Sequence, residues 1–220
     1  MTRIKICGIT NLDDALAASM AGIHALGFNF SKSSPRYIHP KDARKIIDGL
    51  PPFVSCVGVF VEQEPAEINA ICKNCNLDLA QLHSERYTPE TALAITSTKV
   101  IRVFRAGPDF SMKEVIMFAE KTGFRSFLFD AYRPDQAGGT GTTIAKQTAQ
   151  KIFRKMESIG HGILAGGLNP LNVTEAIRTV KPYAVDTASG VEESPGKKDH
   201  QKIIDFVHAV KKAEKAPSIS

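Results

Sequence analysis

Short apolar runs alternate along the chain with longer amphipathic stretches. The short runs are typical of buried β-strands, which we expect at Arg3–Cys7, Ala25–Phe28, Val54–Val61, Leu77–Leu82, Val100–Phe104, Ser126–Asp130, Gly162–Ala165 and Ala184–Thr187. A stretch with helical periodicity follows each run, over residues 11–21, 40–49, 65–73, 88–96, 111–121, 143–157, 171–180 and 199–212. Several of these stretches open at Asn, Pro, Ser or Asp, the residue types that favour helix starts.

This strict alternation predicts an α/β protein with a parallel sheet. Eight strand–helix units fit a single-domain (β/α)8 TIM barrel over residues 1–212, followed by a disordered tail over residues 213–220. The alternative is an open, doubly wound sheet. Polar and Gly-rich segments follow many of the strands, whereas an open sheet gathers its ligand site at one switch point, so we favour the barrel.

Composition narrows the class of protein. The chain has 220 residues, of which 43% are hydrophobic and 23% charged, as in an ordinary globular protein. No run approaches the roughly 20 apolar residues of a membrane span, and the first residues do not resemble a signal peptide. Four cysteines are too few and too unevenly spaced for a disulfide framework. We therefore expect a cytoplasmic protein with no membrane partner.

The net charge of +5 could indicate a nucleic-acid partner. Lys and Arg are scattered along the chain, however, and form no stripe with interleaved aromatics, so we expect no nucleic acid and favour a small anionic substrate.

Cys72 and Cys75 form an isolated C-x-x-C pair, and a structural zinc site would need two more ligands at similar spacing. Thiols at a helix end are the simpler interpretation, and we expect no metal.

Strand alternation indicates which side chains share the inside of the barrel. Lys5 lies on the same face as Cys7, and Leu128 on the same face as Asp130. Corresponding sets on other strands are Ala184 with Asp186 and Ala188, and Leu77 and Leu79 with Gln81. The active face of such a barrel is at the carboxyl ends of its strands, so its mouth would carry a thiol, a carboxylate and an amide.

Glycine-rich segments follow the last three predicted strands, where barrels commonly bind phosphate through main-chain N–H groups. Glycine lets the backbone approach an anion closely. Each segment alone could be an ordinary turn, but their shared position favours phosphate. The candidate phosphate-binding residues are Gly139, Thr140, Gly141, Gly166, Gly167, Ser189 and Gly190.

The order of these motifs resembles the phosphoribosylanthranilate isomerase family. The matching segments are Lys5-Ile6-Cys7-Gly8-Ile9-Thr10, Leu26-Gly27-Phe28, Ser34-Pro35-Arg36-Tyr37, Val57-Gly58-Val59-Phe60, Gln81-Leu82-His83, Asp130 with Gly138-Gly139-Thr140-Gly141, Leu164-Ala165-Gly166-Gly167-Leu168, Asp186 with Ser189-Gly190-Val191-Glu192, and Pro195-Gly196-Lys197-Lys198-Asp199. The resemblance implies an aldose–ketose isomerisation of N-(5'-phosphoribosyl)anthranilate in tryptophan biosynthesis, without cofactor or metal.

By this resemblance Cys7 is the general base and Asp130 the general acid. An ordinary thiol is only a few per cent ionised at neutral pH, so Cys7 needs either a lowered pKa or a tolerance of a small active fraction. Lys5 could supply positive potential, unless a carboxylate across the barrel neutralises it. Asp130 needs a raised pKa, which an apolar neighbour such as Leu128 could provide. Without the resemblance, Cys7 could be a small buried hydrophobe and Asp130 an acceptor for loop N–H groups.

The resemblance also implies substrate-binding residues. Arg36 would pair with the anthranilate carboxylate from a mobile loop, although a loop arginine is usually just solvated. Gln81 and Asp186 would touch the ligand or hold the catalytic pair, and His83 would pack or form hydrogen bonds. Two departures from the family pattern, Thr142-Thr143 after the Gly-Thr-Gly and Ser84-Glu85 after His83, leave the phosphate donors of the sixth loop open.

Two other functions stay open at this point. A related barrel isomerase of histidine biosynthesis, or a dual-substrate form, performs the same chemistry but carries an aspartate at the first-strand position, so Cys7 argues against it. A catalytically inactive barrel that senses a phosphorylated sugar would not need both Cys7 and Asp130. The expected partner is a small phosphorylated substrate, and family members occur as monomers or homodimers.

Overall fold

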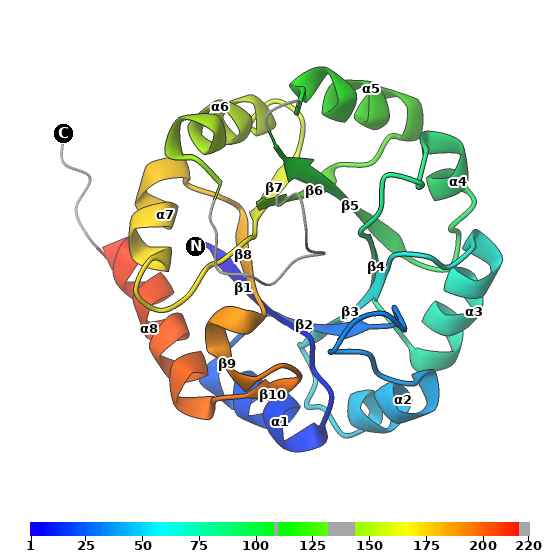
Figure 1. Ribbon diagram of the computed structural model, residues 1–220, viewed down its shortest axis with the longest axis vertical. Helices are drawn as coiled ribbons and strands as arrows, with labels where there is room; N and C mark the ends of the chain where they lie inside the picture. Colours follow the sequence, from blue (N-terminus) through cyan, green and yellow to red (C-terminus); the bar gives the residue numbers. More distant parts are fainter. Residues whose placement is uncertain (108–109, 132–143, 216–220) are drawn as a thin grey trace.

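A computed structural model of the chain describes residues 1–107, 110–131 and 144–215. Parallel strands close into a barrel in the order in which they occur along the chain (Figure 1). They are β1 (Arg3–Cys7), β2 (Ala25–Asn29), β3 (Ser55–Phe60), β4 (Leu79–Leu82), β5 (Lys99–Ala106), β6 (Ser126–Ala131), β7 (His161–Leu164) and β8 (Ala184–Thr187). The prediction of a single-domain (β/α)8 TIM barrel is confirmed, and the open sheet is excluded.

A ring of helices surrounds the barrel, one after each strand (Figure 1). They are α1 (Leu12–Ala21), α2 (Pro40–Asp48), α3 (Pro65–Cys75), α4 (Pro89–Leu93), α5 (Met112–Thr122), α6 (Lys146–Met156), α7 (Val173–Val180) and α8 (His200–Lys215). Between β8 and α8 the chain adds a 3-10 helix, η1 (Ser189–Val191), and an antiparallel hairpin of β9 (Glu192–Ser194) and β10 (Lys197–Lys198). The hydrophobic pattern did not predict this hairpin, because its strands are short and polar.

The carboxyl ends of two helices, α4 and α8, each differ by three residues from the sequence-based expectation. α4 stops at Leu93 because the side-chain oxygen of Asn69 accepts hydrogen bonds from the main-chain N–H groups of Thr96 and Ser97, which a longer helix would use internally. α8 continues to Lys215, past the expected domain boundary at residue 212. The rest of the expected tail, residues 216–220, lies outside the described residues.

The strands separate two apolar clusters. The inner cluster fills the barrel and comprises Val57, Ile101, Val103, Leu128, Ile163, Ala165 and Ala184, with Ala25 and Leu79 packed against it. The outer cluster packs strands against helices and includes Leu26, Phe127 and Phe206. Leu79, Leu128 and Ala184 therefore face inward as strand alternation predicted. The prediction for Leu77 is wrong, because this residue precedes β4 and packs in the outer cluster. Apolar side chains therefore pack the barrel interior below its mouth. This close packing gives rigid support to the polar side chains at the strand ends.

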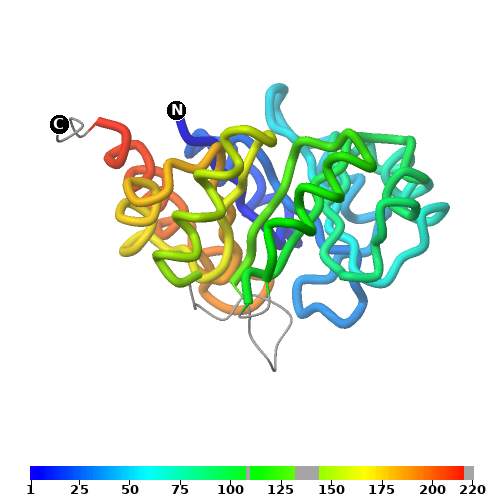
Figure 2. The backbone as a smooth tube through the Cα atoms, turned by 90° about the horizontal axis from the view of Figure 1, so that it is seen from above, coloured from blue at the N-terminus to red at the C-terminus, as the bar shows by residue number. Residues whose placement is uncertain are grey.

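The loops that follow the strands define one end of the barrel. In side view, the loop between β2 and α2 and the β9–β10 hairpin project from the same end, while the N-terminus lies toward the other (Figure 2). Among the helices of the described residues, none has both the length and the apolar character that crossing a membrane requires.

Candidate active site

Cys7 is the last residue of β1 and lies beside Gly27 of β2. A β-carbon at position 27 would come within 2.7 Å of the Cys7 Sγ and 3.1 Å of the Lys5 Nζ, so glycine makes the room that both side chains occupy. Burial raises the pKa of the Cys7 thiol; Lys5 and Lys198 oppose this rise, and Asp186 adds to it. A thiol base needs either a lowered pKa or a tolerance of a small thiolate fraction. Because the pKa of Cys7 is raised, the second option applies.

Lys5 forms a buried ion pair across the β1–β8 seam. Its Nζ lies 2.9 Å from Oδ1 of Asp186, and the two residues are direct neighbours in the strand register. Burial works to lower the pKa of Lys5, but attraction to Asp186 and to Cys7 outweighs it, so the pKa is raised and the ammonium persists. The positive potential expected from Lys5 is thus largely neutralised by a carboxylate, as the sequence left open.

Asp130 lies near the carboxyl end of β6 and is 8% exposed. Burial raises its pKa to about 6, and the negative charge of Asp186 adds to the rise. The main-chain N–H of Ala131, which donates to Oδ1 over 2.9 Å, and the charges of Arg105 and Lys5 oppose it. This carboxyl group therefore keeps a proton far more readily than an exposed aspartate does, as a general acid must.

His83 lies beside this carboxyl group. Its Nε2 is 3.5 Å from Oδ2 of Asp130. Burial lowers the pKa of His83 to about 4, and repulsion from Arg105, Lys5 and Arg102 contributes. The imidazole is therefore neutral near pH 7 and is a polar neighbour of Asp130 that carries no charge.

Gln81 faces the inside of the barrel on β4, where it is 2% exposed. Its side-chain oxygen has no hydrogen-bond partner among the residues that the structure describes. A buried amide oxygen without a partner is costly, so it provides an acceptor for a donor group that enters the mouth.

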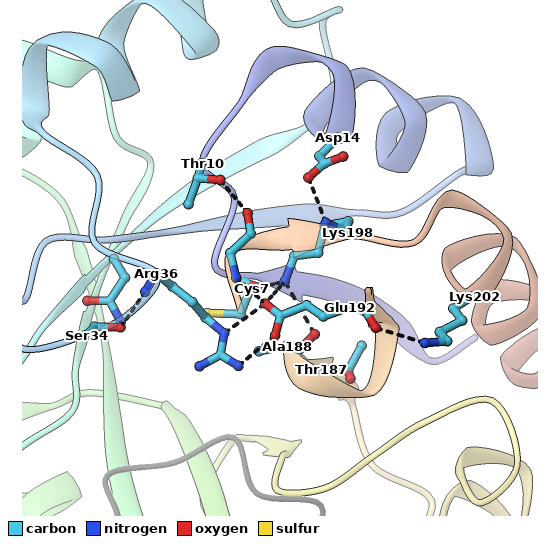
Figure 3. A network of polar contacts seen from close by, with 12 residues as sticks. Cys7, Thr10, Asp14, Ser34, Arg36, Thr187, Ala188, Glu192, Lys198 and Lys202 are labelled. Carbon is cyan, nitrogen blue, oxygen red and sulfur yellow. Dashed lines mark hydrogen bonds and ion pairs between the residues drawn. The ribbon is translucent and has the colours of Figure 1, made fainter. Parts of the chain in front are cut away.

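Arg36 reaches the mouth from the loop after β2, close to Cys7 in the view of Figure 3. Its guanidinium is paired with Glu192 of β9, with Nε 2.8 Å from Oε1 and Nη2 2.6 Å from Oε2. The resemblance implied that Arg36 pairs with the substrate carboxylate, and Glu192 was not among the candidate residues. Its only signal was its place in the Ser189-Gly190-Val191-Glu192 motif.

Gly8 allows this approach. Its φ of +78° is in the left-handed region, and a β-carbon there would lie 2.5 Å from the Cδ of Arg36. Both features require glycine directly after the catalytic candidate Cys7.

The segments after β7 and β8 pack against each other. A β-carbon on Gly190 would lie 1.9 Å from the main-chain oxygen of Leu168, and that oxygen accepts from the Thr187 hydroxyl over 2.6 Å. In the described part of the chain, the main-chain N–H groups of Gly166, Gly167, Ser189 and Gly190 donate to no main-chain carbonyl. Such groups are available to an anion. The other phosphate candidates, Gly139, Thr140 and Gly141, lie outside the described residues.

Comparisons with known proteins agree on one family. A family model for N-(5'-phosphoribosyl)anthranilate (PRA) isomerase matches residues 4–209. The chain is 70% identical over 210 residues to the N-(5'-phosphoribosyl)anthranilate isomerase of Chlorobium phaeobacteroides strain BS1, covering 96% of this chain and 97% of that protein. The corresponding enzyme of Prosthecochloris aestuarii is 61% identical over 214 residues, covering 97% and 96%.

Comparisons with solved structures indicate the same family. The phosphoribosyl anthranilate isomerase of Thermotoga maritima superposes with a TM-score of 0.84 at 40% identity, covering 96% of this chain and 100% of that one. A second isomerase structure, in complex with reduced 1-(o-carboxyphenylamino)-1-deoxyribulose 5-phosphate, has a TM-score of 0.81 at 38% identity, with the same coverage.

Proposed function

The chain belongs to the N-(5'-phosphoribosyl)anthranilate isomerase family, and we propose that it converts N-(5'-phosphoribosyl)anthranilate into 1-(2-carboxyphenylamino)-1-deoxyribulose 5-phosphate in tryptophan biosynthesis. The reaction is an intramolecular redox isomerisation, in which C1 of the sugar is reduced while C2 is oxidised. It needs an acid for the ring oxygen and a base for the proton on C2.

Asp130 is the general acid in this proposal. It gives its proton to the furanose oxygen while the bond from C1 to that oxygen breaks and the anilino nitrogen forms an iminium with C1. The pKa of about 6 supports the assignment, because the carboxyl group is still partly protonated near neutral pH.

Cys7 is the general base. Its thiolate removes the proton from C2, and the electron pair of that C–H bond neutralises the iminium to give an enolamine. Ketonisation then places a proton on C1 and removes one from the hydroxyl group on C2, so substrate and product have the same atoms. The raised pKa of the thiol means that a small fraction of the free enzyme carries the active thiolate.

Two anion sites hold the ends of the substrate. Arg36 pairs with the anthranilate carboxylate, and the main-chain N–H groups of Gly166, Gly167, Ser189 and Gly190 take the phosphate. Gly139, Thr140 and Gly141 complete the phosphate site in this proposal. Gln81 and Asp186 border the sugar between the two ends.

One observation carries the proposal. The thiol of Cys7 and the carboxyl group of Asp130, whose pKa is raised, lie at the carboxyl ends of β1 and β6. The test is turnover of freshly generated N-(5'-phosphoribosyl)anthranilate, followed by the loss of anthranilate-type fluorescence. We expect Cys7→Ala and Asp130→Asn to stay folded and to lose at least about two orders of magnitude in kcat.

Cys56→Ala is the matched control, because Cys56 is a buried strand thiol that packs in the outer cluster. It should keep its kcat. Absence of turnover by the wild-type protein would refute the proposed reaction, and full activity of Cys7→Ala would refute the proposed base.

Assembly and location complete the proposal. A structure of the Thermotoga maritima relative describes that isomerase as dimeric, and we extend a homodimeric state to this chain. A cytoplasmic location is supported by the free state of Cys7, Cys56, Cys72 and Cys75, which suits a reducing compartment.

A further inference from the structure

Lys198 of β10 is a buried cation that belongs to the Pro195-Gly196-Lys197-Lys198-Asp199 motif but received no role from the sequence. Its side chain is 0% exposed. Its Nζ lies 2.6 Å from the main-chain oxygen of Cys7, 3.3 Å from that of Ala188 and 2.8 Å from Oε1 of Glu192 (Figure 3). An ammonium has three N–H donors, so these three acceptors satisfy it fully and fix its position.

Glu192 connects this ammonium to the arginine. Its Oε1 accepts from both Lys198 and Arg36, and its Oε2 accepts from Arg36 alone. A guanidinium has two edges that fit a carboxylate. One edge is formed by Nε and a terminal nitrogen, here Nη2, and the other by the two terminal nitrogens Nη1 and Nη2. Glu192 occupies the first edge, and no described residue bonds Nη1 at the second. The arrangement therefore orients Arg36 so that its second edge stays available.

The hairpin that carries both residues is anchored to the start of the chain. The main-chain N–H of Lys198 donates to Oδ2 of Asp14 over 2.8 Å, and Oδ1 of Asp14 lies 2.8 Å from Nε2 of His200. The Thr10 hydroxyl donates to the main-chain oxygen of Gly196. The hairpin is thus bonded directly to the segment that follows Cys7.

We propose that Lys198 and Glu192 are a positioning pair for the isomerase reaction, which holds Arg36 ready for the substrate carboxylate and sets the electrostatic field at Cys7. The inference rests on the proposed function for the role of Arg36. Neither residue of the pair needs to touch substrate, since Lys198 acts on the backbone and charge of Cys7 and Glu192 acts through Arg36.

The two members of the pair have opposite effects on the thiol. The charges that act on Cys7 are those of Lys5 on β1, Asp186 on β8, Lys198 on β10 and Arg36 in the loop after β2. Lys198 favours the thiolate, and Glu192, bonded to both Lys198 and Arg36, offsets part of their positive charge. Loss of Lys198 should therefore raise the pKa of Cys7, and loss of the Glu192 charge should lower it.

The first test is alkylation of Cys7 by iodoacetamide as a function of pH, with the modified peptide quantified by mass spectrometry. We expect Lys198→Met to slow alkylation near neutral pH by about tenfold, the equivalent of one pKa unit. Glu192→Gln, which keeps size and shape, should speed it. Glu193→Gln and Lys197→Met alter an exposed pair on the same hairpin and should leave the rate unchanged.

The second readout is steady-state kinetics. Glu192→Gln loses the charge-assisted pairing that orients Arg36, so we expect KM to rise by roughly tenfold with a smaller change in kcat. Lys198→Met should lower kcat at neutral pH. If the pair had a merely structural role, Lys198→Met and Glu192→Gln would both loosen the site and would shift the pKa of Cys7 in the same direction. That result would overturn the proposal.

The folding of the variants must be checked separately, because Lys198→Met leaves the buried Glu192 carboxylate with only Arg36 of its two cationic partners. The double variant Lys198→Met/Glu192→Gln removes both charges and should alkylate at a rate between those of the single variants. A double variant that matches either single variant would contradict the opposing effects. Alkylation requires no turnover, so the charge effect on Cys7 can succeed or fail independently of the proposed reaction.

Discussion

Burial raises the pKa of both Cys7 and Asp130 and so favours the protonated form of each, yet the proposed reaction needs Cys7 ionised. The acid is in its active form below a pKa of about 6, and the base is active above a raised thiol pKa. The active combination, with Cys7 ionised and Asp130 protonated, is therefore less populated than the combination with Cys7 protonated and Asp130 ionised. The reaction can proceed through this small active fraction, because the thiolate that does form is a strong base.

This combination predicts an unusual pH profile. As pH rises to about 6 the thiolate fraction grows while Asp130 is still protonated, so kcat/KM should rise. Above that value, growth of the thiolate fraction and loss of the Asp130 proton cancel. We therefore expect kcat/KM to stay level until the pH passes the pKa of the Cys7 thiol, which burial raises above its usual range. Beyond it, kcat/KM should fall.

The measurement is kcat/KM across this range for the wild type and for Asp130→Asn, with the exposed Asp205→Asn as control. Asp130→Asn should lose the change in slope near pH 6, and Asp205→Asn should keep it. A steady fall of wild-type kcat/KM between the two pKa values would refute the assignment of acid and base.

Gly8 allows a second prediction for a single residue. Gly8→Ala should cost about 1–2 kcal/mol of stability from its left-handed backbone, and it should also raise KM because the methyl group displaces Arg36. Gly123→Ala is the matched control, since Gly123 has a φ of +74° but nothing within 4 Å of its added β-carbon. Chemical denaturation should give similar losses for both, and only Gly8→Ala should change KM. Equal KM values would show that Arg36 tolerates the displacement.

At the level of secondary-structure elements, the end of α4 depends on a side chain from another helix. Asn69 of α3 accepts from two main-chain N–H groups after α4 and donates to the main-chain oxygen of Ala94 over 2.8 Å. Asn69→Ala should lower the free energy of unfolding by about 1 kcal/mol or more, because these groups lose their partner.

Urea denaturation measures this change, and Asn74→Ala is the control because Asn74 is an exposed asparagine on the same helix. Both variants should keep wild-type kcat, since α4 ends away from Cys7 and Asp130. If the two variants have equal stability, the segment after α4 is held by other contacts.

For the whole molecule, one exposed aromatic side chain is informative, the most exposed large apolar side chain among the residues that the structure describes. Phe53, between α2 and β3, is 99% exposed and has a φ of +72°. Neither property favours phenylalanine in an isolated barrel, because the ring gains no burial and the backbone is strained. We expect the ring to be buried against a second copy of the chain.

Light scattering should then give twice the 23.9 kDa chain mass for the wild type and a single chain mass for Phe53→Gly. Leu171→Gly, which changes another side chain that is 95% exposed, should remain dimeric. A monomeric wild type, or a dimeric Phe53→Gly, would assign Phe53 no role in assembly.

The order of elements and the identity of the chemical groups could be obtained from the sequence. Strand and helix periodicity are local properties, so β1 and β8 were predicted to the residue and most other elements to within a few residues. The ordered motifs indicated the family, and with it Cys7 and Asp130. The β9–β10 hairpin was missed, because two short polar strands have no periodic signal.

The tertiary structure alone decided how the groups act on one another. Arg36 meets Glu192 across 156 positions of sequence, and Lys198 meets the carbonyl group of Cys7 across 191. Barrel closure creates these contacts, and it also creates the burial that raises the pKa values of Cys7 and Asp130. No local pattern contains such information, because both the distance between two charges and their exclusion from water depend on segments that are remote along the chain.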